Sequence, residues 1–149
     1  MSEPVDTARI LAQLKAGAPA ILAQYPVRLA YVYGSVARGQ ATPLSDVDVG
    51  VLFDEDVASY DRLLAVLDLE WRFKEITDTV LEFQVGDMND RPILLLGEIV
   101  RDGVPIYARD EQDRLTYESA IHERYAIERP RLETYYRAYL RSVLEELRG

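Results

Sequence analysis

Hydrophobic residues recur along this chain in two spacings, one helical and one typical of strands. From Thr7 to Gln24 they fall at near-helical intervals and predict an amphipathic helix, in which Gly17 and Pro19 favour a break into two pieces. Two short segments, 27–33 and 46–53, predict buried strands instead, because they contain the apolar runs 30–33 and 47–53 and several valines.

The remaining pattern alternates helices and strands. It predicts a helix from Val57 to about Phe73, a strand over 79–85, a helix from Pro92 to Arg101 that ends at Gly103, a short strand over 104–107, and a helical segment from Asp110 to Arg148 broken at Pro130. The sequence therefore predicts one α+β (or α/β) domain over residues 1–149, with a helical tail from about residue 110.

Several large side chains are expected to pack rather than to do chemistry. Trp71 is expected in the core, and the tail carries a helical stripe fit for packing, namely Leu132, Tyr136, Leu140, Val143 and Leu147. The tyrosines of the tail are expected to cover the core with their hydroxyls toward water, namely Tyr117, Tyr125, Tyr135, Tyr136 and Tyr139. His122, the single histidine, is expected on a helix surface.

The candidate catalytic residues cluster around the connection between the two predicted strands. Asp46 and Asp48 stand one residue apart at the head of the second strand, so their side chains share one face of it. Two like charges side by side repel unless a cation lies between them, and Mg²⁺ binds one or two carboxylates together with substrate phosphates. We therefore expect Asp46 and Asp48 to be catalytic residues that act as metal ligands.

A Gly-Ser pair at the end of the first strand supplies a second half to this site. Gly34 allows the backbone to approach a ligand closely, and the hydroxyl and amide of Ser35 suit a β- or γ-phosphate. Arg38, one turn further on, would clamp phosphate oxygens or else form an exposed salt bridge. Metal-binding carboxylates that face a phosphate-binding turn are typical of nucleotidyl transfer.

The spacing of these residues resembles a known signature. The order is Gly34 and Ser35, then ten residues, then Asp46, one residue and Asp48. It is similar to the motif of polymerase-beta-type nucleotidyltransferases, and more narrowly to that of the minimal nucleotidyltransferases (MNT). The resemblance implies the nucleotidyltransferase fold, a small mixed β-sheet flanked by helices. It also implies Mg²⁺ as cofactor, ATP as substrate and a HEPN-domain ribonuclease toxin as partner, for which such a protein is the antitoxin.

The third carboxylate that such enzymes usually add from a later strand is where this chain departs from the pattern. Alignment within the family places Gln84 at that position, and Gln84 carries no charge. Glu82 shares a strand face with Gln84, so we take it as the third catalytic acid, although a solvent-facing role fits it as well. Asp87, beyond the strand, is the other candidate.

Composition narrows the function further. The net charge of −9 argues against direct binding of nucleic acid, and suits either a basic protein partner or simple solubility. The absence of cysteine excludes disulfides, thiolate zinc sites and cysteine nucleophiles. No apolar run reaches the ~20 residues of a membrane span and the N-terminus lacks signal-peptide features, so we expect no membrane association and a cytoplasmic location.

The motif indicates Mg²⁺-dependent transfer of a nucleotide, and the resemblance implies that AMP moves from ATP onto a tyrosine hydroxyl of a HEPN toxin. Two alternatives stay open. One is an antitoxin that neutralises its partner by binding alone, which the uncharged Gln84 favours. The other is transfer to a small hydroxylated molecule, for which the chain has little room to hold an acceptor domain.

Overall fold

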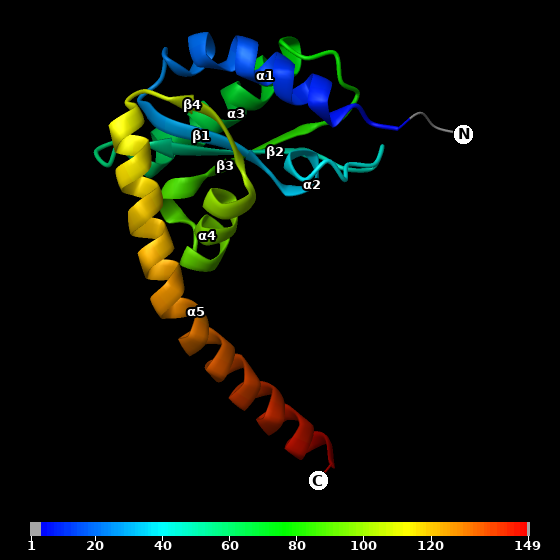
Figure 1. Cartoon of the computed structure of the whole chain (residues 1–149), viewed down its shortest axis with the longest axis vertical. Coiled ribbons are helices and arrows are strands. Elements are labelled where there is room, and N and C mark those ends of the chain that lie inside the picture. The colour runs from blue at the N-terminus through cyan, green and yellow to red at the C-terminus, as the bar shows by residue number, and fades with distance from the viewer. Residues whose placement is uncertain (1–3, 149) are drawn as a thin grey trace.

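The computed structural model describes residues 4–148 (Figure 1). Four strands and five α-helices follow one another along these residues, with one 3₁₀ turn. In chain order they are α1 (Thr7–Leu22), β1 (Val27–Tyr33), α2 (Gly34–Ala37), β2 (Val47–Phe53), α3 (Ser59–Glu75), β3 (Phe83–Asp87), the 3₁₀ turn η1 (Met88–Asp90), α4 (Ile93–Asp102), β4 (Val104–Ala108) and α5 (Glu111–Arg148).

The strands form a single mixed sheet in the order β3-β2-β1-β4. Strand β1 is antiparallel to both of its neighbours, whereas β2 and β3 run parallel. The predicted α+β fold, a small mixed sheet flanked by helices with a helical C-terminal segment, is confirmed.

Each face of the sheet carries its own hydrophobic core. Helices α1 and α3 cover one face, onto which Val47, Val49 and Val51 of β2 point. Helix α4 and the first part of α5 cover the other face, against Leu29 and Tyr31 of β1 (Figure 1). Because side chains alternate along a strand, Asp48 belongs to the face of α4.

Both predicted helix breaks are wrong. Helix α1 runs without interruption through Gly17 and Pro19, since Leu14, Ala18 and Leu22 are fully buried on both sides of the proline and hold the helix against the sheet. Helix α5 likewise runs through Pro130. That proline leaves the carbonyl of residue 126 without its donor, but this part of the helix is exposed and water can reach the carbonyl.

The predicted strand over 79–85 is displaced toward the C-terminus. Strand β3 begins at Phe83 because its ladder needs a partner, and β2 begins only at Val47, which pairs with Phe83. The predicted helix from Val57 likewise begins two residues later, at Ser59.

Large apolar side chains on α3 and α5 do not all enter the core. Trp71 was expected there and is instead 69% exposed. Tyr135, Tyr136 and Tyr139 are exposed as well, because the second half of α5 extends away from the sheet (Figure 1). His122 is exposed on α5, as predicted. Within residues 4–148 no helix is both long and apolar enough to cross a membrane.

Candidate active site

The Gly34 backbone and the Asp48 carboxylate are packed directly against each other. Tyr33 at the end of β1 pairs with Asp48 on β2, and the chain then turns at Gly34 with a φ of +72°. A Cβ placed on Gly34 would lie 2.5 Å from Asp48 Oδ2, closer than any real contact. Only glycine fits this turn, both for its left-handed backbone and for the space that the carboxylate occupies.

Two carboxylates share this end of the sheet. Asp46 is exposed just before β2, and Asp48 is half-buried within it. Burial raises the pKa of Asp48 above its ordinary value, the negative charge of Asp46 raises it further, and the Arg38 guanidinium opposes both effects. The pair is therefore a site of unfavourable negative charge, which a bound cation would relieve.

The phosphate-binding candidates lie on the turn that follows β1. Ser35 is half-buried in α2, and Arg38 is exposed at its C-terminal end, where its Nε donates a long hydrogen bond of 3.4 Å to Gln40 Oε1. Arg38 therefore forms no salt bridge among the described residues, and its positive charge acts to lower the pKa of Asp48.

The parallel pairing of β2 with β3 shows how close each candidate for the third carboxylate lies to Asp46 and Asp48. Gln84 lies directly beside Asp48 in register. Glu82 comes just before β3, and its carbonyl accepts a hydrogen bond of 2.8 Å from the amide of Val47, which sets it beside Asp46. Its carboxylate is 82% exposed and lies 4.0 Å from Lys74 Nζ.

Asp87 is held by structural partners away from this pair. Its carboxylate accepts a hydrogen bond of 2.6 Å from Arg62 Nε and another of 2.9 Å from the amide of Asn89. It stands in register with Val51, three residues along β2 from Asp48. Gln84 and Glu82 are therefore the residues that flank the two aspartates.

A pocket of about 380 Å³ opens beside the Gly34 turn. It lies between that turn and α4, with Arg38 on one side and Glu98, Arg101 and Asp102 on the other. Its volume is in the range of small-molecule sites. The α4 residues were not singled out from the sequence, because nothing in their local pattern distinguishes them from an ordinary helix surface.

Tyr33, which directly precedes Gly34, also lines this pocket. Its ring lies over Gly50, and its hydroxyl is near Gly86 and Arg91, since a Cβ on Gly86 would lie 3.2 Å from an Arg91 guanidinium nitrogen and 3.4 Å from the Tyr33 hydroxyl. Burial raises the pKa of Tyr33, the nearby charge of Asp48 raises it further, and Arg91 lowers it. Arg91 is thus a cation beside the Tyr33 hydroxyl.

The residues present fit a divalent cation that is held partly by its substrate. Among residues 4–148 no group of three or more histidine, cysteine or acidic side chains is arranged to hold a metal ion. Asp46 and Asp48 supply two carboxylates. Because Gly34 has no side chain, the Asp48 carboxylate has room to lie against the turn. Two carboxylates with phosphate oxygens completing the shell are a common arrangement for Mg²⁺.

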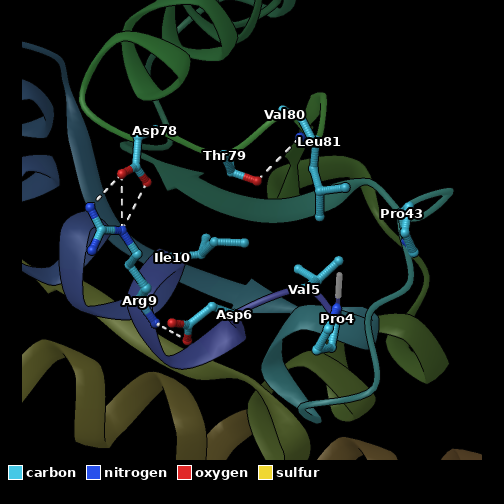
Figure 2. A pocket seen from close by; sticks show the side chains of 10 residues that line it. All are labelled: Pro4, Val5, Asp6, Arg9, Ile10, Pro43, Asp78, Thr79, Val80 and Leu81. Atoms are coloured by element: carbon cyan, nitrogen blue, oxygen red, sulfur yellow. Dashed lines mark hydrogen bonds and ion pairs between the residues drawn. The ribbon is translucent and has the colours of Figure 1, made fainter. Parts of the chain in front are cut away.

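A second hollow, of about 510 Å³, lies under the N-terminal end of α1 and is mostly apolar (Figure 2). Its charged groups already have partners: Arg9 Nε donates to both Asp78 oxygens at 3.1 and 3.0 Å, and the Arg9 amide donates to Asp6 Oδ1 at 3.0 Å. The Arg9–Asp78 bonds fasten α1 to the loop before β3, and the bond to Asp6 caps the start of α1. This hollow lacks the paired carboxylates of the Gly34 turn.

The fold and this arrangement define a nucleotidyltransferase. The family model described as "Polymerase beta, Nucleotidyltransferase" matches residues 19–112, which span every strand and all the residues of the site. The chain belongs to that family. No curated protein sequence matches it significantly.

Two solved structures of similar fold come from toxin–antitoxin complexes. The chain is similar to one chain of a toxin–antitoxin crystal structure with AMP-PNP, with 18% identity, a TM-score of 0.52 and coverage of 86% of this chain and 95% of that one. It is also similar to a chain from tri-AMPylated Shewanella oneidensis HEPN toxin in complex with MNT antitoxin, with 14% identity, a TM-score of 0.56 and coverage of 93% and 99%. At such identities these likenesses establish the fold.

Proposed function

We propose that this chain is an antitoxin that transfers AMP from ATP to a tyrosine hydroxyl of a HEPN ribonuclease toxin. The observation that carries the proposal is the contact between the Gly34 turn and Asp48, which joins a phosphate-binding turn to a carboxylate pair. The two solved structures described above come from toxin–antitoxin complexes, one with AMP-PNP and one with an AMPylated toxin, which supports this acceptor and this nucleotide.

In the proposed reaction the acceptor oxygen attacks the α-phosphorus of ATP. The bond from that phosphorus to the oxygen that bridges to the β-phosphate breaks, and pyrophosphate leaves with its electron pair. Asp46 and Asp48 would hold Mg²⁺, and Gly34, Ser35 and Arg38 would bind the β- and γ-phosphates. When bound, the cation would neutralise the negative charge of the phosphates.

Glu82 takes the proton of the acceptor hydroxyl in this proposal. Its position beside Asp46 and its high exposure let it reach an acceptor on a partner protein. Lys74 Nζ lies 4.0 Å from this carboxylate and is the cation nearest to it in this proposal.

A second function, neutralisation by binding alone, has one specific observation in its favour. The residue in register with Asp48 is Gln84, which brings no third negative charge to the cation. If Glu82 does not supply that charge, the nucleotide site would serve complex formation rather than transfer.

Nucleotide binding tests the site before any partner is needed. Isothermal titration calorimetry with the non-hydrolysable analogue AMP-PNP should show Mg²⁺-dependent binding to the wild-type chain, and binding should be lost in Asp46→Asn and Asp48→Asn. Gln112→Ala, an exposed change at the start of α5, is the matched control and should bind as the wild type does. Binding that is unaffected by either aspartate change would contradict the assignment of the site.

A further inference from the structure

Two glycines leave a gap on the face of the sheet that carries Asp48. Gly50 on β2 and Gly86 on β3 stand in register, so neither strand has a side chain at this point. The Tyr33 ring lies over the first, since a Cβ on Gly50 would lie 3.5 Å from Tyr33 Cε1. A Cβ on Gly86 would lie 3.4 Å from the Tyr33 hydroxyl and 3.2 Å from a guanidinium nitrogen of Arg91. Tyr33 and Arg91 therefore both reach the space over Gly86.

The local sequence holds Arg91 in this place. It ends the 3₁₀ turn η1 and precedes Pro92, which favours the extended backbone that residue 91 adopts, with φ −91° and ψ 147°. Its Nε donates a hydrogen bond of 3.3 Å to the Asp87 carbonyl at the end of β3. This bond and the space above Gly86 together keep the guanidinium over β3.

The positive charge of Arg91 is available to another molecule. The acidic side chains closest to it in sequence are Asp87 and Asp90, and both pair with Arg62, at 2.6 and 2.5 Å. Arg91 is exposed and forms no ion pair within residues 4–148. A guanidinium with unused donors suits an anionic oxygen, because hydrogen bonds between charged groups are the strong ones.

Arg91 lies close to the carboxylate site along β3. Gly86 follows Gln84 by two residues on the same face of the strand, about 6.6 Å further on. Gln84 in turn stands in register with Asp48. The negative charge of Asp48 raises the pKa of Tyr33 and the positive charge of Arg91 lowers it, so the charges of both groups act on the Tyr33 hydroxyl.

The proposed function sets the side from which an acceptor arrives. Its phosphates would lie at the Gly34 turn, which follows β1, and its two aspartates stand at the start of β2. The attacking and leaving oxygens lie roughly in line, on opposite sides of the phosphorus. Strand β2 separates β1 from β3, so the acceptor comes over β3. Because β3 is an edge strand, no further strand of the sheet obstructs a partner protein there.

We propose that Arg91 is a further catalytic residue, which contacts the acceptor oxygen over β3 and stabilises its negative charge during attack. This inference rests on the proposed function and gives the acceptor its chemistry, that of a phenol, which ionises more readily than an aliphatic alcohol. As the new O–P bond forms, the phenol proton passes to Glu82, and pyrophosphate leaves with the electron pair of the broken P–O bond. The uncharged Gln84 suits this arrangement, because a carboxylate there would repel the phenolate.

Steady-state kinetics of AMP transfer to a purified HEPN toxin from the same genome tests this role. Arg91→Gln should lower kcat by about 10²-fold, as loss of one donor to a transition-state oxyanion does. Its affinity for AMP-PNP with Mg²⁺, measured by calorimetry, should be unchanged, since Arg91 contacts the acceptor and not the nucleotide. Arg91→Lys keeps the charge and should recover about tenfold of the lost rate. Arg124→Gln, which removes an exposed arginine of α5, is the matched control and should transfer AMP as the wild type does.

Three results would overturn the role of Arg91 alone. The first is an equal kcat in the wild type and in Arg91→Gln. The second is a loss of AMP-PNP affinity in Arg91→Gln, which would place Arg91 on the nucleotide instead. The third is a rate in Arg91→Lys as low as that in Arg91→Gln, which would show that the charge is not what acts. A wild-type chain that binds AMP-PNP but transfers no AMP would instead contradict the proposed function, and this inference with it.

Discussion

Replacing Gly34 by alanine tests the contact on which the active site depends. Alanine at a φ of +72° carries a backbone cost of about 1–2 kcal/mol, which for a chain of this size lowers Tm by about 2–8 °C. The added methyl would also lie 2.5 Å from Asp48 Oδ2, so the carboxylate must move. Because a displacement of about 1 Å in a catalytic group costs ~10²-fold in rate, AMP transfer should fall by about that factor.

Gly39→Ala separates these two effects. Gly39 has nearly the same backbone conformation, with a φ of +69°, but the nearest atom to a Cβ there is Thr7 Oγ1 at 3.9 Å. It should therefore lose similar stability and keep its AMP-PNP affinity and transfer rate. Calorimetric scans give the stability of both variants, and titration with AMP-PNP and Mg²⁺ gives binding. Equal loss of binding in the two variants, or full activity in Gly34→Ala, would refute the reasoning.

Three further changes test neighbouring parts of the account. Asp48→Asn should raise Tm at pH 7, because the raised pKa of Asp48 means that its ionised carboxylate destabilises the folded state. In calorimetric scans from pH 7 to 3 this gain in Tm should vanish as the pH falls below 3.8, the ordinary pKa of aspartate. Mg²⁺ should raise the Tm of the wild type but not that of this variant. Glu82→Gln should lower the rate of AMP transfer by ~10²–10⁴-fold and leave nucleotide affinity unchanged, whereas Gln84→Ala should change the rate little. Equal transfer rates in the wild type and in Glu82→Gln would show that Glu82 is not the catalytic base. Gly97→Ala should lower the free energy of unfolding by about 1–3 kcal/mol, because its methyl would overlap the Tyr125 ring and push α5 off α4. Denaturant titration should show a smaller loss when Tyr125 is also changed to alanine, and an equal loss there would contradict this packing.

The strands and the site motif were predictable because local sequence determines them. The valine runs of β1 and β2 have no other stable placement than a buried sheet, and the spacing from Gly34 to Asp48 brings the turn beside the carboxylate through one antiparallel pairing. Family alignment placed Gln84 at the third-acid position, and the structure sets Gln84 in register with Asp48.

What the sequence did not reveal depends on contacts between distant segments. The spacing of Trp71, and that of the apolar residues in the second half of α5, predicts an apolar helix face, but not whether this chain or another molecule covers it. The start of β3 depends on where β2 begins, which no local signal near Thr79 encodes. The continuity of α1 through Pro19 likewise depends on burial against the sheet.

The most direct test of the proposed activity is intact-mass spectrometry of a HEPN toxin from the same genome, incubated with this chain, ATP and Mg²⁺. The account predicts added mass in steps of one AMP, mapped to tyrosine, and its loss in Asp46→Asn and Asp48→Asn. An unmodified toxin that is nonetheless bound and neutralised by the chain would contradict transfer and establish inhibition by binding alone.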